Sequence, residues 1–235
     1  MQLRFRPQLI PTLAMMAMIA LTLWLGNWQL GRAEDKAALQ SLFEGRMKEA
    51  PWPLHATDLD GSALHYRQIV ARGTFIEEKQ IFLDNKSLGD RVGYHVITPL
   101  QIEGARISVL VNRGWIARTN EYPAPPKVPV PSGTVEVRGI ATLPVARFLE
   151  LSGANVEGRV WQNLTFERVH ENLGLEVLPI ILLARETLPE LISVQETPDA
   201  GIDKHRGYAF QWFTIAAAIL VVWLAVNAKL DRPRI

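Results

Sequence analysis

Four side chains near the end of the chain could together bind a flat, iron-containing ligand. His205, Tyr208 and Trp212 are spaced so that they fall on one face of a helix, with Phe213 close beside them. A neutral imidazole can be an axial ligand to a porphyrin iron, and aromatic rings can cover the macrocycle. The same residue types gather at membrane surfaces, where aromatic side chains and a flanking histidine contact lipid headgroups. From spacing alone, the membrane-anchor interpretation is the stronger of the two.

A second aromatic group lies near the start of the chain. Trp24 and Trp28 are four residues apart, and Arg32 follows one helical turn later on the same side. In a binding site the indoles would cover a flat ligand, and Arg32, with Arg206, would form charge-assisted hydrogen bonds with its carboxylates. In a plain membrane anchor, Arg32 extends its charge to the surface and the indoles hold the helix at the interface. The anchor interpretation is again the stronger one.

Other catalytic or metal-binding patterns are missing from the sequence. It contains no glycine-rich phosphate loop, no H-E-x-x-H, no G-x-S-x-G and no S-x-x-K. His55, His65 and His170 have no partners at metal-ligand spacing, and we interpret them as surface or partly buried histidines. The chain has no cysteine, which excludes disulfides, thiolate catalysis and thiolate metal sites.

One candidate strand carries polar residues that need an explanation. Asn112 and Arg113 lie within a Val- and Leu-rich segment and are followed by Gly114, which indicates a bulge or a close backbone approach. These polar groups must reach solvent or a buried partner. The segment is either a docking surface or the site of a structural arginine, and we favour the structural arginine.

Two apolar segments must position these residues. Residues 9–28 and 207–228 are each long and apolar enough to span a bilayer, and the first lacks an A-x-A cleavage pattern. The expected organisation is a cytoplasmic N-terminus (1–8), a first span (9–28), an extracytoplasmic domain (29–206), a second span (207–228) and a cytoplasmic C-terminus (229–235).

The charges support this orientation weakly. Basic residues at the outer ends of the spans favour the cytoplasm, but basic residues at the inner ends nearly balance them. The outer set is Arg4, Arg6, Lys229, Arg232 and Arg234, and the inner set is Arg32, Lys36, Lys204 and Arg206. A net charge of +1 over 235 residues gives no reason to expect a nucleic-acid partner.

The middle of the chain predicts one compact domain made mainly of strands. Residues 30–50 predict a helix that leaves the membrane and stops at Pro51–Pro53, and 165–173 predict a short helix ended by Gly174. The predicted strands are Gln68–Phe75, Gln80–Asp84, Val92–Ile102, Arg106–Ala117, Thr134–Thr142 and Val177–Ala184. The expected fold class is an α+β membrane protein, in which two terminal transmembrane helices flank a mainly antiparallel β sheet or partly open barrel.

Several motifs, in their order between the two spans, carry a family resemblance. They are LGNWQLGRAEDK (25–36), GYHVITPL (93–100), LVNRGW (110–115) and HRGYAFQWF (205–213), together with the spacing of Arg67, Val70, Gly73 and Phe75, with Gly139 and Pro144, and with Trp161. The chain resembles the Surfeit-locus family of cytochrome c oxidase assembly factors, nearly from end to end. The family occurs in the bacterial cytoplasmic (inner) membrane and the mitochondrial inner membrane.

The resemblance implies a protein that brings haem a to the large catalytic subunit of the oxidase. The family's proposed haem ligand is the histidine before the YA-x-x-WF pattern, which corresponds to His205, and Tyr208, Trp212 and Phe213 match the same motif. An asparagine pair often precedes this histidine in the family, whereas Asp203 and Lys204 stand there in this chain. The residue that orients the imidazole is therefore left unassigned.

Three hypotheses follow. The favoured one is a non-enzymatic bacterial assembly chaperone that binds haem a transiently and whose β domain contacts oxidase subunits or haem a synthase. The second is a cofactor-free membrane scaffold that holds oxidase subunits through the sheet and the LVNRGW strand. The third, a membrane-tethered hydrolase, has no nucleophile or carboxylate pattern to support it.

Overall fold

The computed structural model describes residues 2–5, 7–144, 156–194, 198 and 201–231. The chain divides into two compact units, one made of its two ends up to Leu42 and from Pro198, the other of Phe43–Thr197. Arg6, Arg232 and Arg234, which entered the orientation argument, lie outside the described residues.

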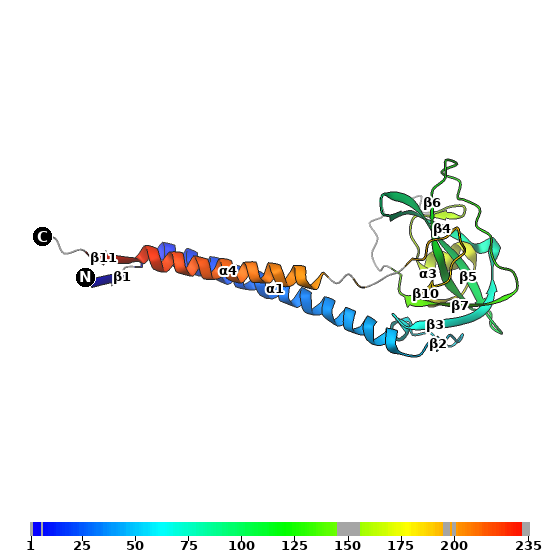
Figure 1. Ribbon diagram of the computed structural model, residues 1–235, viewed down its shortest axis with the longest axis horizontal. Helices are drawn as coiled ribbons and strands as arrows, with labels where there is room; N and C mark the ends of the chain where they lie inside the picture. Colours follow the sequence, from blue (N-terminus) through cyan, green and yellow to red (C-terminus); the bar gives the residue numbers. More distant parts are fainter. Residues whose placement is uncertain (1, 6, 145–155, 195–197, 199–200, 232–235) are drawn as a thin grey trace. The chain divides into compact units, whose positions relative to one another are not determined.

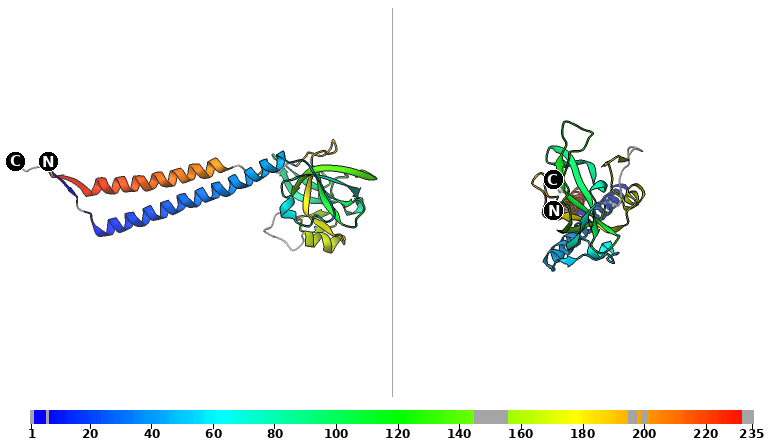
Figure 2. Two further views of the ribbon diagram at one scale, coloured as in Figure 1. Left: turned by 90° about the horizontal axis from the view of Figure 1, so that it is seen from below. Right: turned by 90° about the vertical axis from the view of Figure 1, so that its right-hand side faces the viewer.

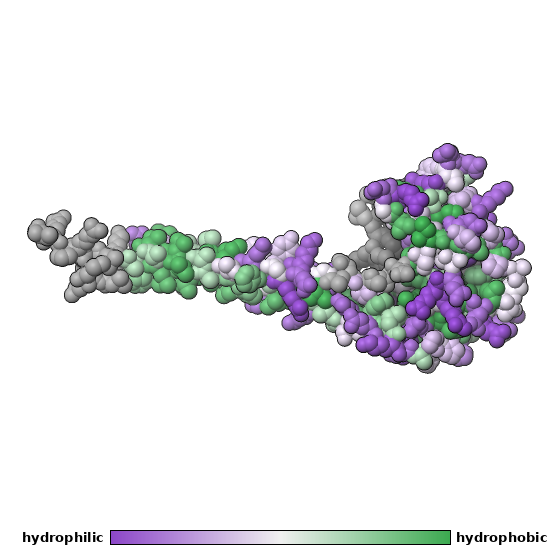
Figure 3. Space-filling view, in the orientation of Figure 1, coloured by the Kyte–Doolittle hydropathy of each residue, from purple (hydrophilic) through white to green (hydrophobic). Residues whose placement is uncertain are grey.

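Two long helices dominate the terminal unit. Helices α1 (Leu9–Lys48) and α4 (Ile202–Asn227) each contain a segment long and apolar enough to cross a membrane, and little of either segment is buried within the protein. Figures 1 and 2 show them side by side, and Figure 3 shows apolar residues gathered on their surface. Such exposed apolar surface is expected of helices that face lipid. The first predicted span lies inside α1, and the predicted helix after it is its direct continuation. The second predicted span lies inside α4 except for its last residue, Ala228, which begins the next strand.

A short antiparallel ribbon that the sequence did not predict joins the two ends of the chain. Strand β1 (Gln2–Phe5) pairs with β11 (Ala228–Asp231), which directly follows α4. The Phe5 ring meets the Trp223 ring edge to face at 5.4 Å. The ribbon holds the first residue of α1 and the last residue of α4 near each other.

The second unit is a β domain with three short helical segments. Its strands, in chain order, are β2 (Trp52–Pro53), β3 (Gln68–Phe75), β4 (Ile81–Leu88), β5 (Arg91–Ile102), β6 (Ser108–Ala117), β7 (Thr134–Thr142), β8 (Val156–Glu157), β9 (Val160–Trp161) and β10 (Val177–Ala184). The helical segments are α2 (Gly61–Leu64), the 3₁₀ turn η1 (Glu77–Lys79) and α3 (Phe166–Leu173). Three strands, β3, β7 and β10, have the predicted bounds.

Five of these strands form a closed barrel. Their order is β3-β7-β10-β6-β5, and β3 pairs with β5 to complete the ring, while β4, β9 and β8 extend the sheet beyond β5. All pairings in the ring are antiparallel except β10 with β6. Closure leaves no free edge among the five strands, which protects them from pairing with other chains.

Two apolar clusters lie on opposite faces of this sheet, because side chains alternate along a strand. The interior cluster includes Ile69, Leu100, Val111, Ile180 and Leu182, all nearly fully buried. The outer cluster is packed under α3 and consists of Ile81, Leu83, Ile97, Leu110, Trp161, Leu164, Val169, Ile181 and Leu183. α3 ends at Gly174, as predicted, with φ 62° at this glycine, and the Thr165 hydroxyl caps its start.

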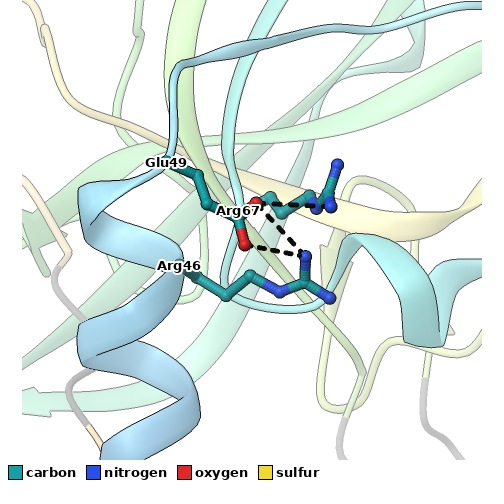
Figure 4. A network of polar contacts seen from close by, with 3 residues as sticks. All are labelled: Arg46, Glu49 and Arg67. Atoms are coloured by element: carbon teal, nitrogen blue, oxygen red, sulfur yellow. Dashed lines mark hydrogen bonds and ion pairs between the residues drawn. The ribbon is translucent and has the colours of Figure 1, made fainter.

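The last turn of α1 is fastened to the β domain by an ionic network (Figure 4). The Glu49 carboxylate lies between two guanidinium groups, 3.2 Å from Arg46 and 3.3 Å from Arg67. Arg67 also stacks on the Trp52 ring at 4.8 Å, and Gln68 donates a hydrogen bond to the Met47 carbonyl oxygen. Arg67 belongs to the family-like spacing, and its structural use here is to hold the end of α1 against the start of β3.

Arg113 has a structural role, as predicted. It is only 5% exposed and donates hydrogen bonds to Gln80 Oε1 at 3.0 Å and to the Pro129 carbonyl oxygen at 2.7 Å. Gln80 in turn donates to the Val128 carbonyl oxygen. These bonds fasten the proline-rich connector between β6 and β7 to the barrel.

The segment Asp84–Lys86, whose Asp and Asn are residue types common in turns, lies inside β4. The pairing of β4 with β5 continues through it, with a register shift between Leu83 and Lys86, and Asn85 has φ 58°. Asparagine tolerates this left-handed conformation, so the same local preference that produces turns produces a β-bulge here.

Candidate functional site

The candidate site lies where α1 and α4 contact each other. Small side chains line the contact: Thr22, Gly26 and Ala33 are buried on α1, and Ala209 and Ala216 on α4. Spacings of three, four and seven residues between such positions are typical of helices that pack at a shallow crossing angle. Trp223 Nε1 donates to Thr12 Oγ1 at 3.2 Å near the terminal ribbon, and a second polar contact joins the helices farther along.

That second contact is between His205 and Gln29. His205 lies in the first turn of α4, half-buried, and its Nδ1 atom is 2.7 Å from the Oε1 atom of Gln29 on α1. An amide oxygen only accepts hydrogen bonds, so Nδ1 carries the proton and donates it to Gln29. In the neutral imidazole the remaining nitrogen, Nε2, then keeps its lone pair.

This arrangement suits metal ligation by Nε2. Ligating histidines usually donate their other ring nitrogen to a fixed acceptor, which holds the tautomer and the ring orientation and makes the ligand more basic. Gln29 supplies such an acceptor, and haem iron accepts imidazole as an axial ligand. The donor set at His205 is therefore compatible with a haem.

The other α4 residues of the predicted site differ in how far they are exposed. Trp212 and Phe213 are half-buried, whereas Tyr208 is 44% exposed at the edge of the helix contact. The Phe213 ring packs directly on Gly26, where a Cβ atom would lie 2.6 Å from Phe213 Cε1. The Phe213 ring therefore fits in this position because Gly26 has no side chain.

The predicted α1 residues lie on a different face. Trp24 is 63% and Trp28 48% exposed, on the side of α1 away from the buried positions Thr22 and Gly26. Arg32 lies 5.8 Å from the Trp28 ring and 4.0 Å from Asp35. These three residues follow one another along α1, as their spacing predicted, and among the described residues no hydrogen bond, ion pair or ring contact joins them to His205.

An apolar groove of about 520 Å³ runs between the same two helices nearer the terminal ribbon. It is lined by Pro11, Ala14, Met15 and Met18 of α1 and by residues of α4 from Ile215 to Asn227. His205 is not part of its lining.

The remaining histidines do not form a metal site in the part of the chain that the structure describes. Within those residues no group of three or more His, Cys, Asp or Glu side chains could hold a metal ion. His65 stacks on the Tyr66 ring at 3.7 Å, and His55 and His170 are exposed.

Gln29 is the site residue that sequence reasoning missed. It stands inside LGNWQLGRAEDK, one residue after Trp28, but its spacing relative to Trp24 and Trp28 puts it on another face of α1. The available signal was a polar side chain directly after an apolar span, where a polar group can find a partner on a neighbouring helix.

Proteins with sequences similar to this chain match it over most of its length. The sequence model of the SURF1 family matches residues 16–217. Surfeit locus protein 1 of Homo sapiens is 25% identical over 214 residues, covering 85% of this chain and 71% of the human protein. The protein of the same name from Xenopus tropicalis is 27% identical over 218 residues, covering 86% and 71%. A SURF1-like protein of Monosiga brevicollis is 22% identical over 239 residues, covering 92% and 87%. The matched range includes the whole β domain and overlaps both apolar helices. The chain therefore belongs to the SURF1 family of cytochrome c oxidase assembly factors.

Proposed function

We propose that this protein binds haem a through His205 and hands it to the large catalytic subunit of cytochrome c oxidase. Membership of a family of oxidase assembly factors supports the target, and the His205–Gln29 hydrogen bond supports the ligand. That bond carries the proposal, because it fixes an imidazole with a free Nε2 lone pair.

Each residue of the site has a distinct task in this proposal. His205 supplies Nε2, Gln29 holds the ring, and Tyr208, Trp212 and Phe213 offer aromatic surface to a flat ligand. Trp24, Trp28 and Arg32 remain predicted contacts on a separate face. In this proposal haem a is the cargo, so the protein needs to hold it without reacting with it.

A carrier also has to release its cargo, so we expect moderate affinity. The two apolar helices keep a poorly soluble cofactor at the membrane during transfer. We propose that the chain is a multi-pass protein of the bacterial cytoplasmic membrane with its β domain facing the periplasm. Haem a synthase is a further proposed partner, because it would be the source of the cofactor.

The test is the pigment of the purified protein. Full-length protein is produced in cells that make haem a, purified in detergent and examined by absorption spectroscopy and haem extraction. Wild-type protein should carry haem a, and His205→Ala should lose most of it. Gln29→Ala should lower haem affinity about 10- to 100-fold, the usual cost of removing the acceptor behind a ligating histidine.

His55→Ala is the matched control, since His55 is exposed on the β domain and its side chain makes no hydrogen bond with any residue that the structure describes. Equal haem content in wild type and His205→Ala would exclude His205 as the ligand. Wild-type protein that is free of haem but retains oxidase subunits would favour the cofactor-free scaffold instead.

A further inference from the structure

A small pocket of about 100 Å³, with both apolar and polar residues in its lining, lies on the outer face of the β domain, beside the apolar cluster under α3. Its polar lining comes from the adjacent strands β4, β5 and β6, from the end of β7 and from the segment before α3: Lys86, His95, Asn112, Thr142 and Asn163. No carboxylate is among the described residues that line it. His95 and Asn112 belong to the two strand motifs, GYHVITPL and LVNRGW, to which the haem proposal gives no role.

Two β-bulges flank His95. On one neighbouring strand, β4, the bulge at Asn85 precedes Lys86, and the Lys86 carbonyl oxygen accepts a 2.7 Å hydrogen bond from Trp115 Nε1. On the other, β6, the pairing with β5 shifts directly after His95, opposite Gly114 at φ 137°. β-bulges change the direction of nearby side chains and are common next to functional sites. Here one bulge lies on each of the two strands that pair with β5 beside His95.

The hydrogen bonds at His95 define whether its ring offers a hydrogen-bond donor or an acceptor to the pocket. The Asn112 Oδ1 atom accepts from the backbone N–H of Gly114 at 3.1 Å, so its Nδ2 atom is the one that faces His95 Nδ1, at 3.4 Å. Asn112 therefore donates to Nδ1, and the neutral ring carries its proton on Nε2. His95 offers a hydrogen-bond donor, the opposite of what His205 offers.

The charges around His95 also favour a ligand that accepts hydrogen bonds. Burial, and secondarily the charge of Lys86, lowers the pKa of His95 to about 4, so the ring is neutral at physiological pH. Lys86 makes no ion pair with any residue that the structure describes, and within the same residues the Asn163 side chain has no hydrogen bond. The pocket thus combines one uncompensated cation with neutral donors, which suits an anionic acceptor.

We propose that this pocket binds one carboxylate, the side chain of an aspartate or glutamate on a partner protein. Lys86 supplies the counter-charge, and the Nε2–H of His95 and the Asn163 amide donate hydrogen bonds. The size of the pocket favours a protein side chain over a free metabolite, because small-molecule sites commonly measure about 300–1,000 Å³. The proposal is independent of haem binding and survives if His205 is not a ligand.

The experiment uses full-length protein in detergent with ¹⁵N-labelled histidine, and follows the His95 ring nitrogens by NMR. Aspartate blocked at both ends (N-acetyl, N-methylamide) should shift the His95 Nε2 resonance saturably, and blocked asparagine should not. Acetate serves as the free carboxylate and should bind no more tightly than blocked aspartate. Binding of acetate without binding of blocked aspartate would overturn the assignment to a protein side chain, and a lack of response to both would overturn the site.

Variants then test the residues. Lys86→Gln should weaken binding of blocked aspartate at least about tenfold, since it removes the counter-charge. Lys127→Gln is the control, an exposed lysine that does not line the pocket, and should leave binding unchanged. In protein that is also labelled with ¹⁵N at tryptophan, the Trp115 indole N–H resonance reports whether β4 keeps its position in Lys86→Gln. Asn163→Ala should weaken binding severalfold and covers the case in which Lys86→Gln does not fold. Unchanged affinity in a folded Lys86→Gln protein would refute the proposal.

Discussion

In two histidines of this chain, a neighbouring side-chain amide determines which ring nitrogen carries the proton, with opposite results. The oxygen of Gln29 accepts from Nδ1 of His205, which leaves Nε2 as a potential ligand. The nitrogen of Asn112 donates to Nδ1 of His95, which leaves Nε2–H as a donor. One amide on a neighbouring element therefore decides whether a histidine suits a metal or an anion.

The buried position of His95 should make the stability of the β domain depend on pH. Its pKa is about 4 in the folded protein, below the ordinary 6.5, so the unfolded chain binds more protons between these values. The free energy of unfolding should therefore fall as the pH drops from 6.5 towards 4. Allowing for partial exposure of the ring, we expect His95 to account for about 1–2 kcal/mol of this loss.

Urea unfolding followed by circular dichroism at pH 6.5 and 4.5 measures this effect. His95→Gln should lose less stability than wild type over this interval by that amount. His170→Gln, at an exposed histidine of α3, should behave like wild type. An identical pH dependence in wild type and His95→Gln would contradict the prediction.

At the scale of elements, the contact between α1 and α4 depends on small residues. A side chain at Gly26 would occupy the place of the Phe213 ring, whereas a Cβ at Gly31, in the same helix, would meet nothing within 4 Å. Gly26→Leu should therefore displace Phe213, disturb the nearby His205–Gln29 contact and lower the midpoint of thermal unfolding in detergent.

Gly31→Leu is the matched control, with the same gain in helix propensity of up to about 1 kcal/mol and no steric conflict. It should leave the unfolding midpoint unchanged or raise it slightly. Equal midpoints in the two variants would show that close packing at Gly26 does not hold the helices together.

Local sequence patterns predicted most elements well. Segments rich in Val and Ile correctly predicted the ends of β3 and β7, a continuous apolar run predicted those of β10, and Gly174 correctly marked the end of α3. Asp84–Lys86 contains Asp and Asn, which are common in turns because they tolerate the left-handed conformation. In the fold, β5 supplies pairing partners on both sides of this segment, so the same preference becomes a bulge inside β4.

For the whole molecule, the proposed orientation can be tested directly because the chain has no cysteine. Single variants then report exposure through one thiol. Ser132→Cys, on the exposed connector of the β domain, should react with a membrane-impermeant maleimide in intact spheroplasts. Gln8→Cys, just before α1, should react only after the membrane is permeabilised, because we propose that it faces the cytoplasm.

The reverse labelling pattern would show that the β domain faces the cytoplasm. Labelling of both thiols in intact spheroplasts would show that the two positions lie on one side, which is incompatible with α1 as a spanning helix between them. Activity of the variants is not needed, since the measurement reports exposure alone.

The sequence by itself determined the two apolar helices, most strands, the family resemblance and the candidate ligand His205. These follow from local properties, namely runs of apolar residues, periodicity and ordered motifs. Only the tertiary structure decided that the sheet closes into a five-stranded barrel, that the ends of the chain pair as a ribbon, and that Gln29 meets His205. Such contacts join residues far apart in the chain, and no local preference specifies which of many compatible partners a strand edge or a polar side chain will find.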